Sequence, residues 1–142
     1  MSWSKDEVVS FINEQTRIGR LATVAADGTP HVVPIWFKTD GNRLLVHTQA
    51  ESRKARNIAA TGKYSITIDQ EALPYKGVTV GGSAQIVGDE IVDSRALAKD
   101  LAVAYMGPEQ GPGFGEYVAN MPGQHITLVL DIDEHEAWDF AG

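Results

Sequence analysis

The sequence contains no cysteine among its 142 residues. This absence excludes disulfide bonds, thiolate zinc sites and cysteine nucleophiles. No apolar run approaches the roughly 20 residues that a membrane-spanning helix needs, and the first residues lack the apolar stretch of a secretion signal. We therefore expect a single cytoplasmic domain over residues 1–142, long enough to bury a core.

Positive charge is also scarce, because 12 Lys and Arg residues stand against 19 Asp and Glu residues, for a net charge of −7. Nucleic-acid binding needs a basic surface, so this balance argues against it. The exception is the segment 52–64, which contains Arg53, Lys54, Arg56 and Lys63 and no acid. A local basic patch on an acidic protein predicts a small anionic partner.

Three of these cations lie at the start of a predicted helix. Ser52 is a good N-cap residue for a helix over residues 53–61. The unpaired N–H groups and the dipole already make this end positive, so Arg53, Lys54 and Arg56 are unfavourable there unless an anion is bound. The pattern predicts an anion site, most simply for phosphate. The alternative is a solvated helix face whose long side chains turn away from any ligand.

Two further helices are expected. Ser4 and Glu7 form a capping-box pattern before a helix that runs to about Glu14. Asp93 caps a second helix that runs to about Tyr105. The rest alternates or is rich in β-branched residues, which predicts strands over residues 17–25, 31–38, 43–48, 64–69, 77–87, 124–132 and 136–140.

Turn residues indicate how these strands connect. Asp27-Gly28 and Asp40-Gly41 predict tight turns that join the first three strands into an antiparallel meander. Pro34 predicts an edge or a bulge in the second strand. The pair Gly81-Gly82 predicts a bulge, or a place where a ligand or another backbone comes close.

Towards the end of the chain, the Gly/Pro-rich segment 107–115 is expected to be a mobile loop at a rim or between subunits, followed by a short helical turn over residues 116–120. Together these features predict a mainly β protein. We expect an antiparallel barrel of six or seven strands with two to three flanking helices.

The order of the segments resembles the split β-barrel flavin-binding proteins related to pyridoxamine 5'-phosphate oxidase. The resemblance is carried by RIGRLATVAADGTPHVVPIWF and LLVHTQAESRKARNI, followed by YSITID, GVTVGGSAQIV and EAWDF, and it covers nearly the whole chain. The chain is most similar to the branch of small oxidoreductases that use the deazaflavin coenzyme F420. This resemblance implies the FMN-binding split-barrel fold, and a homodimer with cofactor sites at the interface.

The resemblance also implies roles for single residues. Ser52, Arg53 and Lys54 fall on the family's phosphate-contacting motif, and Arg56 and Asn57 lie beside it, where the F420 branch holds an anionic tail. The other implied cofactor contacts are His47 and Thr48 beside the ribityl chain, Pro34, Ile35 and Trp36 along the ring system, Gln85 on a later strand, and Trp138 from the other subunit.

Three functions remain open. The first is an F420-dependent oxidoreductase that transfers hydride from the reduced deazaflavin to an unsaturated small organic substrate. The second is an FMN-binding oxidoreductase, and the third a non-catalytic cofactor- or heme-binding protein of the same fold. The cations beyond those needed for one phosphate favour the first. Because the sequence ends without the Arg-containing tail of pyridoxamine oxidases, vitamin B6 oxidation is not expected.

No catalytic residue is assigned, because a flavin or deazaflavin carries the difficult chemistry itself. A proton donor is needed for hydride transfer to a double bond. Water would suffice, and His31, His47 and Tyr75 are the side-chain candidates. The histidines lack carboxylates at ligand spacing, so we expect no metal site.

Overall fold

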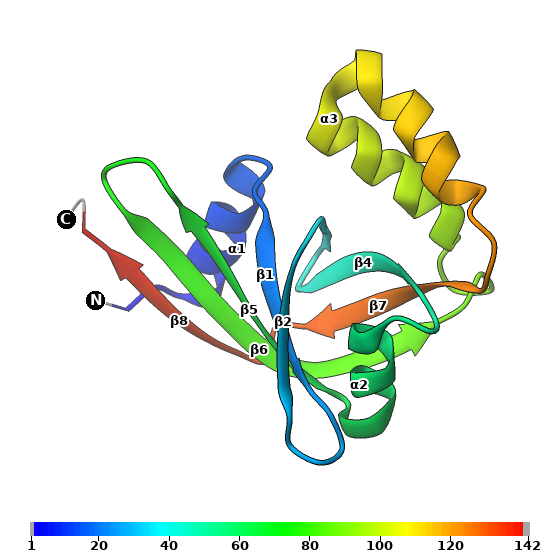
Figure 1. Ribbon diagram of the computed structural model, residues 1–142. Helices are drawn as coiled ribbons and strands as arrows, with labels where there is room; N and C mark the ends of the chain where they lie inside the picture. Colours follow the sequence, from blue (N-terminus) through cyan, green and yellow to red (C-terminus); the bar gives the residue numbers. More distant parts are fainter. Residues whose placement is uncertain (1, 141–142) are drawn as a thin grey trace.

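This computed structural model describes residues 2–140, which form three helices and eight strands (Figure 1). In chain order the elements are α1 (Lys5–Glu14), β1 (Gly19–Val24), β2 (Pro30–Ile35), β3 (Lys38–Asp40), β4 (Arg43–Gln49), α2 (Arg53–Thr61), β5 (Lys63–Gln70), β6 (Lys76–Val87), α3 (Ser94–Ala119), β7 (His125–Asp131) and β8 (Glu134–Asp139). No helix among the described residues is long and apolar enough to cross a membrane.

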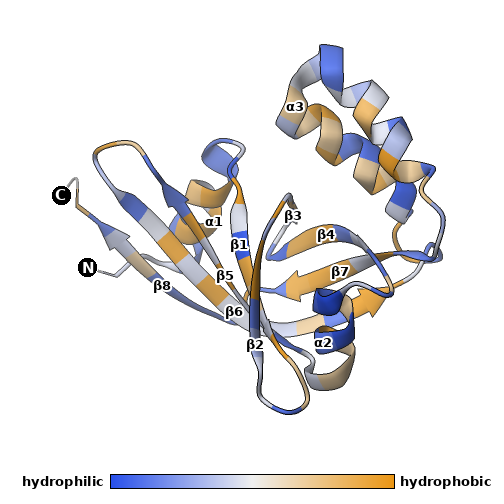
Figure 2. Ribbon diagram, in the orientation of Figure 1, coloured by the Kyte–Doolittle hydropathy of each residue, from blue (hydrophilic) through white to orange (hydrophobic). Residues whose placement is uncertain are grey.

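The strands form one curled antiparallel sheet. Their order is β2-β1-β5-β6-β7-β4-β3, and β8 pairs with β6 beside this path. The core lies in the hollow of the sheet, where Leu21, Ile66 and Leu128 are fully buried. Apolar residues concentrate along β7, whereas the start of α2 is polar (Figure 2). The predicted mainly β split barrel is confirmed.

Strand β6 belongs to both halves of the barrel. Its first half, up to Gly81, pairs with β8, and its second half, from Ala84, pairs with β7. Gly82 has φ +147°, and a side chain there would collide with the carboxylate of Asp133, which accepts a hydrogen bond from the N–H of Ser83 at 2.8 Å. The paired glycines are thus a place of close approach, but the neighbour of Gly82 is the side chain of Asp133 and not the ligand or backbone that the sequence predicts.

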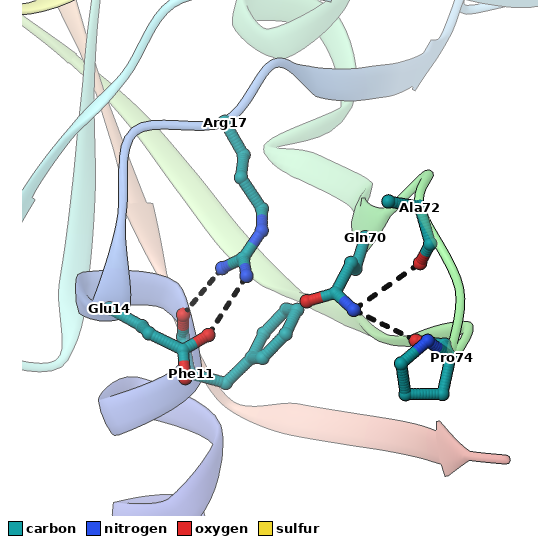
Figure 3. A network of polar contacts seen from close by, with 6 residues as sticks. All are labelled: Phe11, Glu14, Arg17, Gln70, Ala72 and Pro74. Atoms are coloured by element: carbon teal, nitrogen blue, oxygen red, sulfur yellow. Dashed lines mark hydrogen bonds and ion pairs between the residues drawn. The ribbon is translucent and has the colours of Figure 1, made fainter. Parts of the chain in front are cut away.

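Helix α1 has the predicted capping box, because Ser4 and Glu7 each accept a hydrogen bond from the other's N–H at 3.1 Å. The helix buries Phe11 in the core. Its end is fastened by Arg17, whose guanidinium donates to the carbonyl of Phe11 and the carboxylate of Glu14, both at 2.9 Å (Figure 3).

The loop between β5 and β6 lies on the same side of the barrel (Figure 3). The amide of Gln70 donates to the carbonyls of Ala72 at 3.3 Å and Pro74 at 2.8 Å. The side chain of Gln70 thus holds the loop that separates β5 from β6.

The predicted three-strand meander is wrong. The expected strand 31–38 is divided into β2, which pairs with β1, and β3, which pairs with β4. The backbone leaves the ladder at Trp36 and Phe37, where the N–H of Phe37 donates to the hydroxyl of Tyr105 at 3.1 Å. The expectation for Pro34 is confirmed, since β2 is the last strand of its edge.

The predicted loop 107–115 is also wrong, because these residues and the expected turn 116–120 belong to the second half of a helical hairpin. The chain reverses at Gly107, which has φ +90° and ψ 171° inside α3. Pro108 then starts the second half, at a position where a helix needs no N–H donor. Figure 1 shows this hairpin standing over β4 and β7.

The glycines of this segment allow the two halves of the hairpin to pack closely. A Cβ on Gly111 would lie 2.5 Å from the Cα of Val103, and one on Gly115 would lie 3.0 Å from the Cα of Lys99. Gly111 and Gly115 are four residues apart and so share one face of the helix. Composition predicted a loop, but the glycines provide backbone contact between helices.

We predict opposite effects for two Gly→Ala changes in this helix. Gly111→Ala should lower the free energy of unfolding by about 1–3 kcal/mol because its methyl group meets backbone. A methyl group on Gly113 would meet nothing within 4 Å beyond its own helix turn, so Gly113→Ala should raise it by about 0.5–1 kcal/mol. Urea denaturation measures both. Equal stability of the two variants would contradict the packing of the hairpin.

Candidate functional site

Helix α2 begins and ends where the sequence predicts. The hydroxyl of Ser52 caps it by accepting from the N–H of Ala55 at 3.3 Å. Buried Thr48, at the end of β4, donates its hydroxyl to Ser52 Oγ at 2.9 Å. Gly62 ends the helix with φ +66° and donates its N–H to the carbonyl of Ile58. The junction of β4 and α2 is therefore held by side chains, and the first turn of the helix contains no acid.

The three cations of this turn do not point the same way. At about 100° per residue, Arg53 and Arg56 lie about 60° apart on the helix, whereas Lys54 lies about 160° from Arg56. Both arginines are exposed, and Lys54 is half-buried. Within residues 2–140 none of the three takes part in an ion pair. The basic cluster is thus divided between an outer arginine pair and one inward lysine.

Lys54 lines a cavity of about 200 Å³ beneath the helical hairpin, with Ile35, Trp36, His47, Ala98, Leu101, Phe114 and Val118. Trp36 stacks on Tyr105 with ring centroids 5.1 Å apart and meets the edge of Phe114 at 5.8 Å. Burial in these surroundings lowers the pKa of the Lys54 ammonium. A bound anion or carbonyl oxygen would offset that loss of solvation.

A larger cavity, of about 390 Å³, lies between α1, β3 and α3. It contains Arg17 and Tyr105 but none of the predicted cofactor contacts. Arg17 is already bonded to Phe11 and Glu14. The cavity beneath the hairpin is therefore the better candidate for the site.

Two histidines form a bonded pair beside Lys54. The Nε2 atom of His47 on β4 lies 2.8 Å from Nδ1 of His125 on β7. Burial, followed by His125, Lys54 and Arg95, lowers the pKa of His47 to about 4. His47 is therefore neutral at pH 7 and poorly suited to be the proton donor for which the sequence made it a candidate.

The structure brings together only part of the predicted site. Ile35, Trp36, His47 and Lys54 meet in the cavity, and Ser52 and Thr48 support the adjacent helix end. Arg53 and Arg56 flank that end from outside. The positions of these residues do not test whether they contact a cofactor, so their roles stay predictions.

The other predicted contacts lie elsewhere. Asn57 is buried and donates to Thr23 Oγ1 at 3.0 Å, between α2 and β1. Pro34 and Gln85 are exposed on β2 and β6. Trp138 pairs with Gly77 on β6, roughly 26 Å of strand from Gln85 at about 3.3 Å per residue. Trp138 is not among the residues that line the cavity of its own chain.

The remaining proton-donor candidates also lie outside the cavity. His31 is on β2, where its Nδ1 is buried without a hydrogen-bond partner. Tyr75 is 49% exposed, next to the loop between β5 and β6. Of the three candidates only His47 therefore lines the cavity, where it is neutral, and Lys54 is the other ionisable side chain of the lining.

Sequence reasoning missed the part of the cavity that α3 and β7 supply, namely Ala98, Leu101, Phe114, Val118 and the neighbouring His125. Phe114 and Val118 fall in the segment expected to be a loop and turn. Their spacing of four residues matches that of Gly111 and Gly115 and is the signal that favours a helix.

The chain is similar in sequence to a known protein family and to one characterised reductase. A family model described as pyridoxamine 5'-phosphate oxidase matches residues 4–139. A 5a,11a-dehydrotetracycline/5a,11a-dehydrooxytetracycline reductase from Streptomyces rimosus is 35% identical over 75 residues. That match covers 47% of this chain and 53% of the relative, so it spans about half of the relative's length.

Two solved structures are similar over most of the chain. An F420 reductase has 26% identity and a TM-score of 0.70, covering 89% of this chain and 94% of its own. The conserved hypothetical protein Rv2991 from Mycobacterium tuberculosis has 23% identity and a TM-score of 0.74, covering 99% and 87%. The second likeness supports the fold alone.

His47 makes stability depend on pH. The unfolded chain takes up a proton near the ordinary pKa of 6.5, whereas the folded protein does so only near 4. Between these values the unfolded state binds more protons, so stability falls as the pH falls. We expect His47→Asn to reduce this fall by about 1 kcal/mol, a value discounted because the ring is only half-buried. Urea denaturation from pH 7 to pH 4 measures it.

His135, which is exposed on β8, provides the matched control. His135→Asn should keep the wild-type dependence on pH. The same pH dependence in His47→Asn as in the wild type would contradict the assignment.

Proposed function

Because the chain belongs to the pyridoxamine 5'-phosphate oxidase family, we propose that it is an oxidoreductase that binds the deazaflavin coenzyme F420. The observation that carries this proposal is a half-buried lysine with no ion-pair partner among the described residues, at the positive end of α2. Arg53 and Arg56 add positive charge outside it. Three cations at a helix N-terminus are stabilised by a multiply charged anion.

In this proposal the chain binds and orients the cofactor. Lys54 and the N–H groups of the first turn of α2 hold a phosphate, and the two arginines hold the anionic tail. Trp36 and Phe114 provide an apolar wall that excludes water from the reacting end. The bound deazaflavin supplies hydride transfer from its reduced ring to an electrophilic double bond. The names of the S. rimosus reductase and of the F420 reductase support a reductive reaction.

One observation favours FMN as the alternative cofactor. Arg53 and Arg56 point away from Lys54, so a single cation faces the cavity. A single phosphate, as in FMN, needs no more than this lysine and the helix end. The two arginines then belong to the solvated face that sequence reasoning kept as an alternative.

The effect of removing each part of the cluster tests the proposal. Lys54→Met should weaken F420 binding about 10- to 100-fold, since it removes a charge-assisted hydrogen bond. The pair Arg53→Ala and Arg56→Ala should weaken F420 binding and reduce its dependence on salt, while affecting FMN binding less. Fluorescence titration with each cofactor measures these changes.

Arg43 is a matched control, because it is an exposed cation at the β3–β4 turn, paired with Asp40 at 3.5 Å. Arg43→Ala should bind F420 like the wild type. Unchanged affinity of Lys54→Met would contradict the proposed site.

We further propose that the site is completed by a second copy of the chain. Trp138 pairs with Gly77, in the half of β6 that pairs with β8, and it does not line the cavity that contains Lys54 in its own subunit. The outer face of β1 and β2 carries apolar residues, with Val24 40% and Val32 66% exposed. A homodimer that covers this face would bury apolar surface and bring the partner's Trp138 to the cofactor.

Mixing two defective variants tests this arrangement. Lys54→Met and Trp138→Ala subunits, unfolded together and refolded, should regain up to about a quarter of the wild-type sites, because each mixed dimer contains one site with both residues intact. Activity with reduced F420 and F420 binding both measure the recovery. No recovery from a mixture that forms dimers would contradict a shared site.

A further inference from the structure

The hydrogen bonds of the two histidines determine where their protons lie. Nε2 of His125 is 2.8 Å from the carbonyl oxygen of Met121. A carbonyl only accepts, so His125 carries a proton on Nε2. In a neutral ring its Nδ1 is then an acceptor, and His47 must donate its own Nε2–H to it across 2.8 Å.

The pair lies in surroundings that disfavour a positive charge. His125 is 6% exposed, and Lys54 from α2 and Arg95 from α3 add positive charge around His47. No described carboxylate forms an ion pair with either histidine. A cationic ring would therefore lack a counter-ion and lose solvation.

This assignment leaves Nδ1 of His47 without a proton. No described group donates a hydrogen bond to it, and it is not among the buried polar atoms that lack a partner. His47 and Lys54 both line the cavity, and the charge of Lys54 acts on the His47 ring. The same cavity is thus lined by a residue that donates hydrogen bonds and by a residue with an acceptor that is still open.

We propose that His47 is a specificity-determining hydrogen-bond acceptor, held in one tautomer by His125, that selects ligands presenting a hydroxyl or ring N–H next to an oxygen bound by Lys54. His125 is the positioning residue. Phosphate or carboxylate oxygens alone would face the lone pair of Nδ1 and be disfavoured. This inference rests on the proposed function, since it describes how the same cavity recognises part of its cofactor or substrate.

The first test needs no ligand. In wild-type protein labelled with ¹⁵N-histidine, the signals of His47 should be those of the Nε2–H tautomer from pH 5.5 to pH 8. His125→Asn retains an amide oxygen near the position of Nδ1 and should preserve this signature, whereas His125→Gln should release it. An Nδ1–H tautomer in the wild type, or titration of His47 near pH 6.5, would overturn the proposal.

The second test uses F420 and FMN as separate probes. His47→Asn places an amide oxygen near Nδ1, and His47→Gln places its amide near Nε2. His47→Gln should weaken binding of the preferred cofactor about five- to thirtyfold, the usual effect of one lost hydrogen bond, and His47→Asn by less. For a recognition group on the substrate, the same order should appear in KM while cofactor affinity stays unchanged.

Failure of this inference is distinguishable from failure of the proposed function. Tight cofactor binding with equal affinities and KM values for the Gln and Asn variants would overturn the role of His47 and leave the cofactor assignment intact. A wild-type protein that binds neither cofactor would contradict the proposed function, while the spectrum of the free protein still decides the tautomer.

Discussion

The change of partner along β6 is the constraint on which the rest of the structure depends. The strand pairs with β8 before the glycine pair and with β7 after it, and Asp133 holds the point of change by accepting from Ser83. Only a residue without a side chain leaves room for that carboxylate at Gly82. Because β7 then pairs with β4, the end of β4 and the start of α2 lie next to the hairpin that follows β6.

The site formed there conflicts with the stability of the free protein. Three cations occupy the positive end of α2, Lys54 is partly removed from water, and His47 is neutral through burial beside other basic groups. The two charged features cost free energy without a ligand, and His47 does so only below about pH 6.5. Such conflicts are concentrated at functional sites, since binding offsets them. The capping residues themselves follow the ordinary rules, as Ser4, Ser52 and Gly62 show.

The parts of the fold that were predictable depend on neighbours in sequence. The capping box of α1, the limits of α2 and the edge position of Pro34 follow from local chemistry. The break at Phe37 does not, because the partner of its N–H is Tyr105, 68 residues away. The glycines of the hairpin predict a loop when only the local sequence is considered. The reason for a glycine at position 111 is its close contact with the backbone of Val103, which the sequence alone does not show.

The site shows the same division. The positive charge at the start of α2 is evident from the sequence. The helix period of 3.6 residues also predicts that Lys54 lies on a different face of α2 from Arg53 and Arg56. The pairing of His47 with His125 depends on the register of β4 against β7, which joins residues 78 apart in sequence. Residue type could not reveal that one histidine fixes the proton of another.

The most direct measurement of the central claim is a titration of the wild-type protein with F420 and, separately, with FMN, at moderate and raised salt. Quenching of tryptophan fluorescence reports binding, and Trp36→Phe identifies the signal from the cavity. We expect tight F420 binding that weakens with salt, weaker FMN binding, and loss of part of the quenching in Trp36→Phe, since the partner's Trp138 also lies at the proposed site. Tighter binding of FMN than of F420, or binding of neither, would contradict the proposed site.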